Sequence, residues 1–72
     1  MYGHAIKEYL DENDIKYSFI AKETGIPLNV FSALLNDKRK ISVEEYFRIC
    51  AELNLDANYF MNKIRQVEQT PA

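Results

Sequence analysis

The sequence has few of the residues that build metal sites and disulfides: it contains one cysteine and one histidine in 72 residues. Cys50 alone cannot close a disulfide within the chain, and one cysteine with His4 cannot supply the four ligands of a tetrahedral zinc site. We therefore expect no metal and no cofactor. No group of side chains has the spacing of a catalytic constellation, since even Glu44 and Glu45 diverge on a helix, and we expect no enzymatic activity.

Long hydrophobic runs are also missing, although 47% of the residues are hydrophobic. No segment approaches the run of about 18 to 20 apolar residues that a membrane span needs. The first residues, "MYGHAIKEYLDEN", mix charged and apolar side chains, unlike a secretory signal. We expect a cytoplasmic protein without membrane contact, made of one domain at residues 1–66 and a polar tail at residues 67–72.

The net charge of −2 hides an uneven distribution of basic residues. Residues 1–15 carry one base against four acids, and residues 41–72 carry three bases against five acids. Residues 16–40 carry five bases against two acids, which gives this segment a charge of +3. A basic segment inside an otherwise acidic chain is what we expect if one face meets phosphate.

The sequence predicts an all-α fold, because no alternation of apolar and polar residues is sustained as in a strand and only two glycines and two prolines interrupt the chain. Turn residues divide it into five expected helices, at about 4–12, 17–24, 27–35, 43–53 and 57–66.

Specific residues mark the ends of these helices. Gly25 lies where a left-handed C-cap is expected, and Pro27 suits the first turn of the following helix. The stretch "SVEE" has the pattern of a capping box between Ser42 and Glu45. Asn54 is expected to end the fourth helix.

Apolar residues at three- and four-residue spacing predict the core. They are Ile6, Leu10, Ile20, Ala21, Ile26, Phe31, Leu34, Leu35, Val43, Tyr46, Ile49, Cys50 and Leu53. In this pattern Cys50 is a small core residue rather than a reactive thiol.

The helices at 17–24 and 27–35 form a pair joined by a short turn that contains glycine, an arrangement that can hold the second helix at a steep angle to the first. Burying Phe31 and Leu34 leaves another set of side chains on the outer face of the second helix. This set, narrow enough to enter a major groove, comprises Leu28, Asn29, Ser32 and Ala33.

The core positions of this pair carry a resemblance to a known family. Ala21, Gly25, Ile26, Phe31 and Leu34 have the spacing seen in phage lambda-repressor-like, Cro-type helix-turn-helix proteins. The stretch "SALLND" resembles the end of that family's recognition helix, and "ISVEEYFRICAELNLDANYFM" resembles its fourth and fifth helices. The resemblance implies a compact five-helix domain with the helix-turn-helix at the second and third helices.

The resemblance also implies how such a domain would meet double-stranded DNA. The start of the second helix, here Lys16, Tyr17 and Ser18, would lie over a phosphate, with the Tyr17 hydroxyl offered to it. The first residues of the recognition helix, here Leu28, Asn29, Ser32 and Ala33, would meet base edges. The segment that follows would grip the sugar-phosphate backbone with Asn36, Lys38 and Arg39.

Three positions depart from the family pattern. Tyr17 and Leu28 stand where glutamine is common, and Asp37 stands where glycine is common. With Asn29 able to pair with adenine, and Leu28, Val30 and Ala33 able to touch thymine methyl groups, the sequence predicts an A·T-rich half-site.

The resemblance further implies a homodimeric transcriptional regulator, because one such module covers only a half-site. The predicted dimer interface lies on the fifth helix, at Tyr59, Phe60, Met61 and Ile64. A second interpretation stays open, in which the same fold binds a protein, as in an antitoxin or antirepressor, through Leu28 and Val30. The acidic total charge and Asp37 favour that alternative, whereas the basic segment favours DNA.

Overall fold

The computed structural model describes residues 2–62 of the chain. Four α-helices follow one another, and residues 58–62 form a further helical segment. The helices are α1 (Tyr2–Glu12), α2 (Tyr17–Thr24), α3 (Leu28–Leu35) and α4 (Val43–Glu52). The all-α prediction is confirmed, and the bounds of α2 are those predicted. The predicted end of the fifth helix, with Ile64, and the tail at 67–72 lie outside the described residues.

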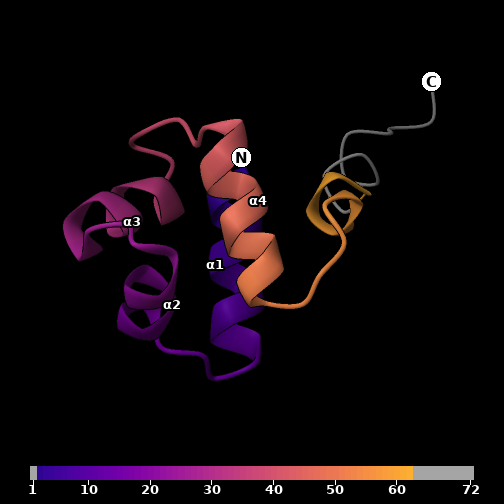
Figure 1. Cartoon of the computed structure of the whole chain (residues 1–72), viewed down its shortest axis with the longest axis horizontal. Coiled ribbons are helices and arrows are strands. Elements are labelled where there is room, and N and C mark those ends of the chain that lie inside the picture. Colours follow the sequence, from indigo (N-terminus) through magenta and orange to yellow (C-terminus); the bar gives the residue numbers. More distant parts are fainter. Residues whose placement is uncertain (1, 63–72) are drawn as a thin grey trace.

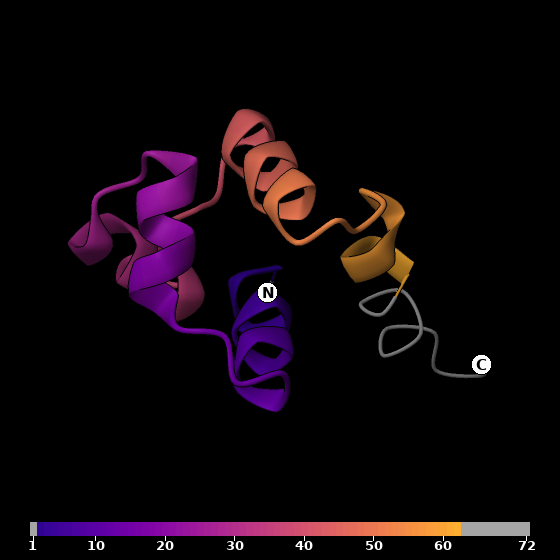
Figure 2. The ribbon, with the colours of Figure 1, turned by 60° about the horizontal axis from the view of Figure 1, so that its bottom comes forward.

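The helices are arranged around α1 and α4. In both views, α2 and α3 lie to one side of this pair and the segment at 58–62 lies to the other (Figures 1 and 2). α3 packs against α1 and α2, and α2 also packs against α4. No helix of residues 2–62 is both long enough and apolar enough to cross a bilayer.

The core lies where these helices meet, and its largest side chains have almost no exposed surface. The fully buried residues come from every helix, namely Ile6, Leu10, Ile20, Phe31, Leu34, Leu35, Ile49 and Phe60. Cys50 is buried as predicted, and burial raises the pKa of its thiol, which keeps it protonated. Thr24, a buried polar side chain, donates its hydroxyl to the Ile20 carbonyl at 2.7 Å. Its burial therefore leaves no polar atom unpaired.

One core prediction and one interface prediction are wrong. Val43 was expected on the buried stripe of α4, but 70% of its surface is exposed. The stripe begins one turn later, at Tyr46, because Val43 is the first helical residue, directly after the N-cap Ser42 and within the capping box. Phe60 was assigned to a dimer interface, yet it is fully buried in the core of a single chain. Its ring meets those of Tyr9, Tyr46 and Tyr59 edge to face and thereby anchors the segment at 58–62.

α3 and α4 begin with different N-caps. Pro27 precedes α3 as its N-cap, one position earlier than predicted. Ser42 begins α4 with the predicted capping box: its hydroxyl accepts the Glu45 N–H at 3.1 Å, and the Glu45 carboxylate accepts the Ser42 N–H at 2.9 Å. Two N–H groups that would otherwise lack partners are satisfied in this way.

Each of the four helices is followed, one or two residues after its last residue, by a residue with left-handed backbone. The φ angles are 54° at Asp14, 75° at Gly25, 57° at Asp37 and 56° at Asn54. In each case the next residue donates its N–H to a carbonyl five residues earlier, as in Ile15 to Leu10 at 2.8 Å. This is the Schellman motif, which is usually built with glycine. Only α2 uses glycine for it, so the other three ends carry conformational strain.

Replacing Asp14 with glycine is therefore expected to raise the free energy of unfolding by about 0.5–1 kcal/mol. Glycine adopts the left-handed conformation without strain, and the change also removes a negative charge from the carbonyl end of α1. Urea unfolding followed by circular dichroism measures the difference. Asp14→Asn is the control, because it removes the charge but keeps a Cβ. If Asp14→Gly is less stable than Asp14→Asn, backbone strain at this position is not the cause.

Candidate nucleic-acid interface

The outer face of α3 presents the side chains predicted to read bases. Leu28 has 51% of its surface exposed, Asn29 and Ser32 are exposed, and Ala33 is partly buried. Phe31, Leu34 and Leu35 turn the opposite side of the helix into the core. Since residues four apart share a face, Leu28 aligns with Ser32 and Asn29 with Ala33. α3 therefore carries a continuous ridge whose side chains are mostly small or polar.

The start of α2 provides the predicted phosphate position. Lys16 is the N-cap with extended backbone, and no side chain caps the helix. Lys16 and Ser18 are both exposed. The positive end of the α2 dipole is thus left open to an anion, with a lysine beside it.

Tyr17 is arranged differently from the prediction. Its ring is partly buried against the core, and its hydroxyl donates to the Asp11 carboxylate at 2.5 Å. The hydrogen bond to Asp11 is the main cause of the raised pKa of Tyr17. The hydroxyl is therefore engaged by α1, and an acidic group lies next to the predicted phosphate position. A phosphate contact by Tyr17 would have to replace this bond.

At the end of α3, Asn36 contacts Lys7, which the sequence did not indicate as part of the site. Asn36 donates its side-chain N–H to the Ser32 carbonyl at 2.9 Å, while its amide oxygen accepts a hydrogen bond from Lys7 at 3.3 Å. Lys7 belongs to α1 and to the acidic first part of the sequence. Its ammonium group nevertheless adds positive charge beside the predicted backbone-contacting residues. Because the two residues are 29 positions apart, only the packing of α1 on α3 brings them together.

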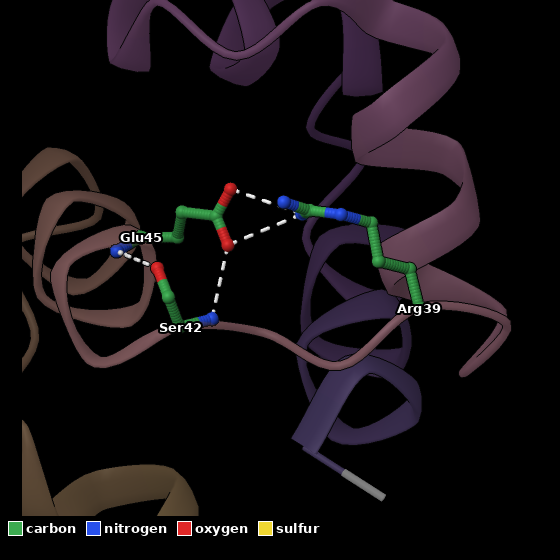
Figure 3. A network of polar contacts seen from close by, with 3 residues as sticks. All are labelled: Arg39, Ser42 and Glu45. Atoms are coloured by element: carbon green, nitrogen blue, oxygen red, sulfur yellow. Dashed lines mark hydrogen bonds and ion pairs between the residues drawn. The ribbon is translucent and has the colours of Figure 1, made fainter.

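The connector between α3 and α4 holds three basic residues, Lys38, Arg39 and Lys40. Lys38 and Lys40 are exposed, and Lys38 also donates its backbone N–H to Ala33. Arg39 is turned toward α4, where its guanidinium meets both carboxylate oxygens of Glu45 at 3.0 and 3.2 Å (Figure 3). Arg39 was predicted to contact phosphate. In this structure the partner of its guanidinium is instead a carboxylate of the same chain.

Glu45 therefore takes part both in the capping box of α4 and in the pairing with Arg39. The Ser42 N–H and the Arg39 guanidinium both favour the ionised carboxylate, which lowers the pKa of Glu45. The same carboxylate begins α4 and restrains the arginine predicted to contact DNA (Figure 3). The sequence showed the capping box, but not its second partner.

Asp37 lies between the two groups of predicted backbone contacts. Its left-handed conformation ends α3, and its side chain is exposed. A carboxylate at this point opposes the charge of Lys38 and Arg39. Asp11 and Glu45, which lie outside residues 16–40, also meet Tyr17 and Arg39, so the surface of the helix-turn-helix is less positive than the +3 of this segment suggests.

The comparison with protein families covers the four helices α1 to α4. A family model described as a Cro/C1-type HTH DNA-binding domain matches residues 5–57, from the first turns of α1 to the start of the segment at 58–62. The chain belongs to the Cro/C1-type helix-turn-helix family. Membership of this DNA-binding family confirms the resemblance and agrees with the pairing of α2 and α3. No match was found among curated proteins or among solved structures.

The structure leaves the predicted site residues in three groups. The start of α2, the outer face of α3 and the connector after α3 each present exposed polar or basic side chains. Tyr17 and Arg39 instead meet acidic partners from α1 and α4. Among the predicted interface residues, Phe60 is in the core, Tyr59 is partly buried and Met61 is exposed.

Proposed function

We propose that the chain is a sequence-specific transcriptional regulator of double-stranded DNA, acting in the cytoplasm as a repressor and as a homodimer. The observation that supports this best is the outer face of α3, where Asn29 and Ser32 are exposed in the second half of a helix-turn-helix. In such a pair the second helix enters the major groove.

Base contacts would come from the ridge of α3. Asn29 can form two hydrogen bonds with adenine, and Leu28 and Ala33 can lie against thymine methyl groups. An A·T-rich half-site is the expected consequence. Two such modules related by a dyad would read half-sites about 34 Å apart.

Phosphate contacts would position the ridge without reading sequence. Lys16 lies at the open N-terminus of α2, and Lys38 lies directly after α3. Lys7, held beside Asn36, adds a third cation at the end of the recognition helix. These residues come from α1, from the start of α2 and from the connector after α3, so the proposed phosphate contacts do not depend on one segment.

The experiment that tests this proposal is selection from random duplex DNA, with bound sequences recovered at low and moderate salt. We expect an enriched, dyad-symmetric, A·T-rich site, because Asn29 and Leu28 favour adenine and thymine. With three phosphate contacts per module, the slope of log K against log salt should be about −2.7 for each half-site. A consensus made only of G·C pairs would contradict the proposed base contacts, and no enrichment at either salt would contradict sequence-specific binding.

A second function is supported by exposed apolar surface on the helix-turn-helix. Phe19 on α2 is 53% exposed and Leu28 on α3 is 51% exposed, and neither is needed to close the core. Such residues suit a protein partner, as in an antitoxin or antirepressor. Salt separates the two functions, because DNA binding weakens steeply as counterions compete and an apolar protein contact hardly responds.

A further inference from the structure

An apolar surface that the sequence did not predict lies on α4. Val43, Phe47 and Met61 are 70%, 53% and 38% exposed, and together with Tyr2 and Ile41 they line a groove of about 200 Å³. The groove joins the start of α4 to the segment at 58–62. Three large apolar side chains gathered at one groove exceed the scattered exposure that is normal for a soluble protein.

The exposed side of α4 forms a regular ridge. Val43, Phe47 and Ala51 are spaced four residues apart and are all exposed, whereas Tyr46 and Cys50 face the core. Ridges of this spacing are those by which two helices interlock in the commonest mode of helix packing. The small side chain of Ala51 leaves room for a larger residue of another helix to approach.

The charges beside this ridge indicate which partner fits it. Glu44 and Arg48 lie one turn apart on α4 and form an exposed ion pair. If a second α4 crosses the first in the opposite direction about a two-fold axis, Glu44 of each copy lies toward Arg48 of the other. The surface is therefore complementary to itself in charge as well as apolar, as an isologous contact requires.

We propose that the ridge of Val43, Phe47 and Ala51, with Met61 at its edge, is the surface through which two copies of this chain associate. This inference rests on the proposed homodimer and places its interface on α4 rather than at Phe60. Met61, which was assigned to the interface from the sequence, remains part of it. Because association is measured without DNA, its outcome is separate from that of the DNA-binding proposal.

The test is sedimentation of the full chain over a range of concentrations, with Phe47→Glu compared with Phe19→Glu. Both phenylalanines are 53% exposed, so the two variants replace the same side chain at equal exposure. We expect the wild-type chain to dimerise and Phe47→Glu to raise the dimer dissociation constant at least about thirtyfold. Phe19→Glu should dimerise like the wild type. Circular dichroism verifies that both variants are folded.

A charge exchange tests the proposed orientation of the two helices. Glu44→Arg should weaken association by placing like charges opposite one another, and Glu44→Arg with Arg48→Glu should restore it. A wild-type chain that stays monomeric, or equal effects of Phe47→Glu and Phe19→Glu, would overturn the proposal. Failure of the double variant to recover would overturn the antiparallel arrangement of α4.

Discussion

Replacing Gly3 with alanine is expected to lower the free energy of unfolding by about 1–3 kcal/mol. A Cβ at Gly3 would lie 1.7 Å from the carbonyl oxygen of Leu34 and 2.8 Å from its carbonyl carbon. Both are backbone atoms at the end of α3, so no side-chain rotation removes the clash. Alanine also favours helix by about 1 kcal/mol over glycine, which makes a net loss diagnostic of the close contact.

The control for Gly3 is the other glycine of the chain. Gly25 has a φ of 75°, but a Cβ there would meet nothing within 4 Å. Gly25→Asn should therefore cost only a few tenths of a kcal/mol, since asparagine tolerates this conformation and the chain already uses Asn54 in it. Thermal and urea unfolding compare the two variants with the wild type. If Gly3→Ala is as stable as the wild type, the packing of α1 against α3 does not require a glycine at this contact.

The contrast between the two glycines shows what the sequence could predict. Gly25 is local: its role follows from the residues next to it, and both the left-handed cap and the end of α2 were predicted correctly. The capping box at Ser42 was predicted for the same reason. Gly3 depends on Leu34, far along the chain, and nothing in its neighbourhood indicates that two backbones meet there.

The candidate site likewise has features that follow from the local sequence and features that depend on packing between helices. The exposed ridge of α3 could be predicted, because periodicity separates Asn29 and Ser32 from the buried Phe31. The partners of the basic residues near this ridge could not be predicted. Arg39 turns to a carboxylate on α4 and Lys7 turns to Asn36, and these pairings arise from packing between helices. Spacing along one helix indicates which side chains are exposed, but not which exposed side chains meet.

The pairing of Arg39 leads to the second large prediction. Glu45→Gln is expected to tighten DNA binding about threefold to tenfold, if the chain binds DNA as proposed. The carboxylate now holds the Arg39 guanidinium at 3.0 and 3.2 Å, so a phosphate must displace it (Figure 3). Glutamine removes the competing charge and can still accept the Ser42 N–H, so α4 keeps its capping box.

The salt dependence distinguishes a released arginine from a mere change in net charge. One added phosphate contact should steepen the slope of log K against log salt by about 0.9 per module. Glu52→Gln is the control: it removes the same charge from an exposed position at the other end of α4. We expect Glu52→Gln to leave the slope unchanged.

The double variant Arg39→Gln with Glu45→Gln completes the comparison. If Glu45 acts by withholding Arg39, removing the carboxylate gives no gain once the guanidinium is absent, and the two changes are not additive. Equal gains in the presence and absence of Arg39 would instead show that Glu45 repels phosphate directly. A weaker complex for Glu45→Gln alone would reverse the interpretation: the carboxylate would then hold Arg39 in the orientation that DNA requires, and the capping box would position the connector for binding.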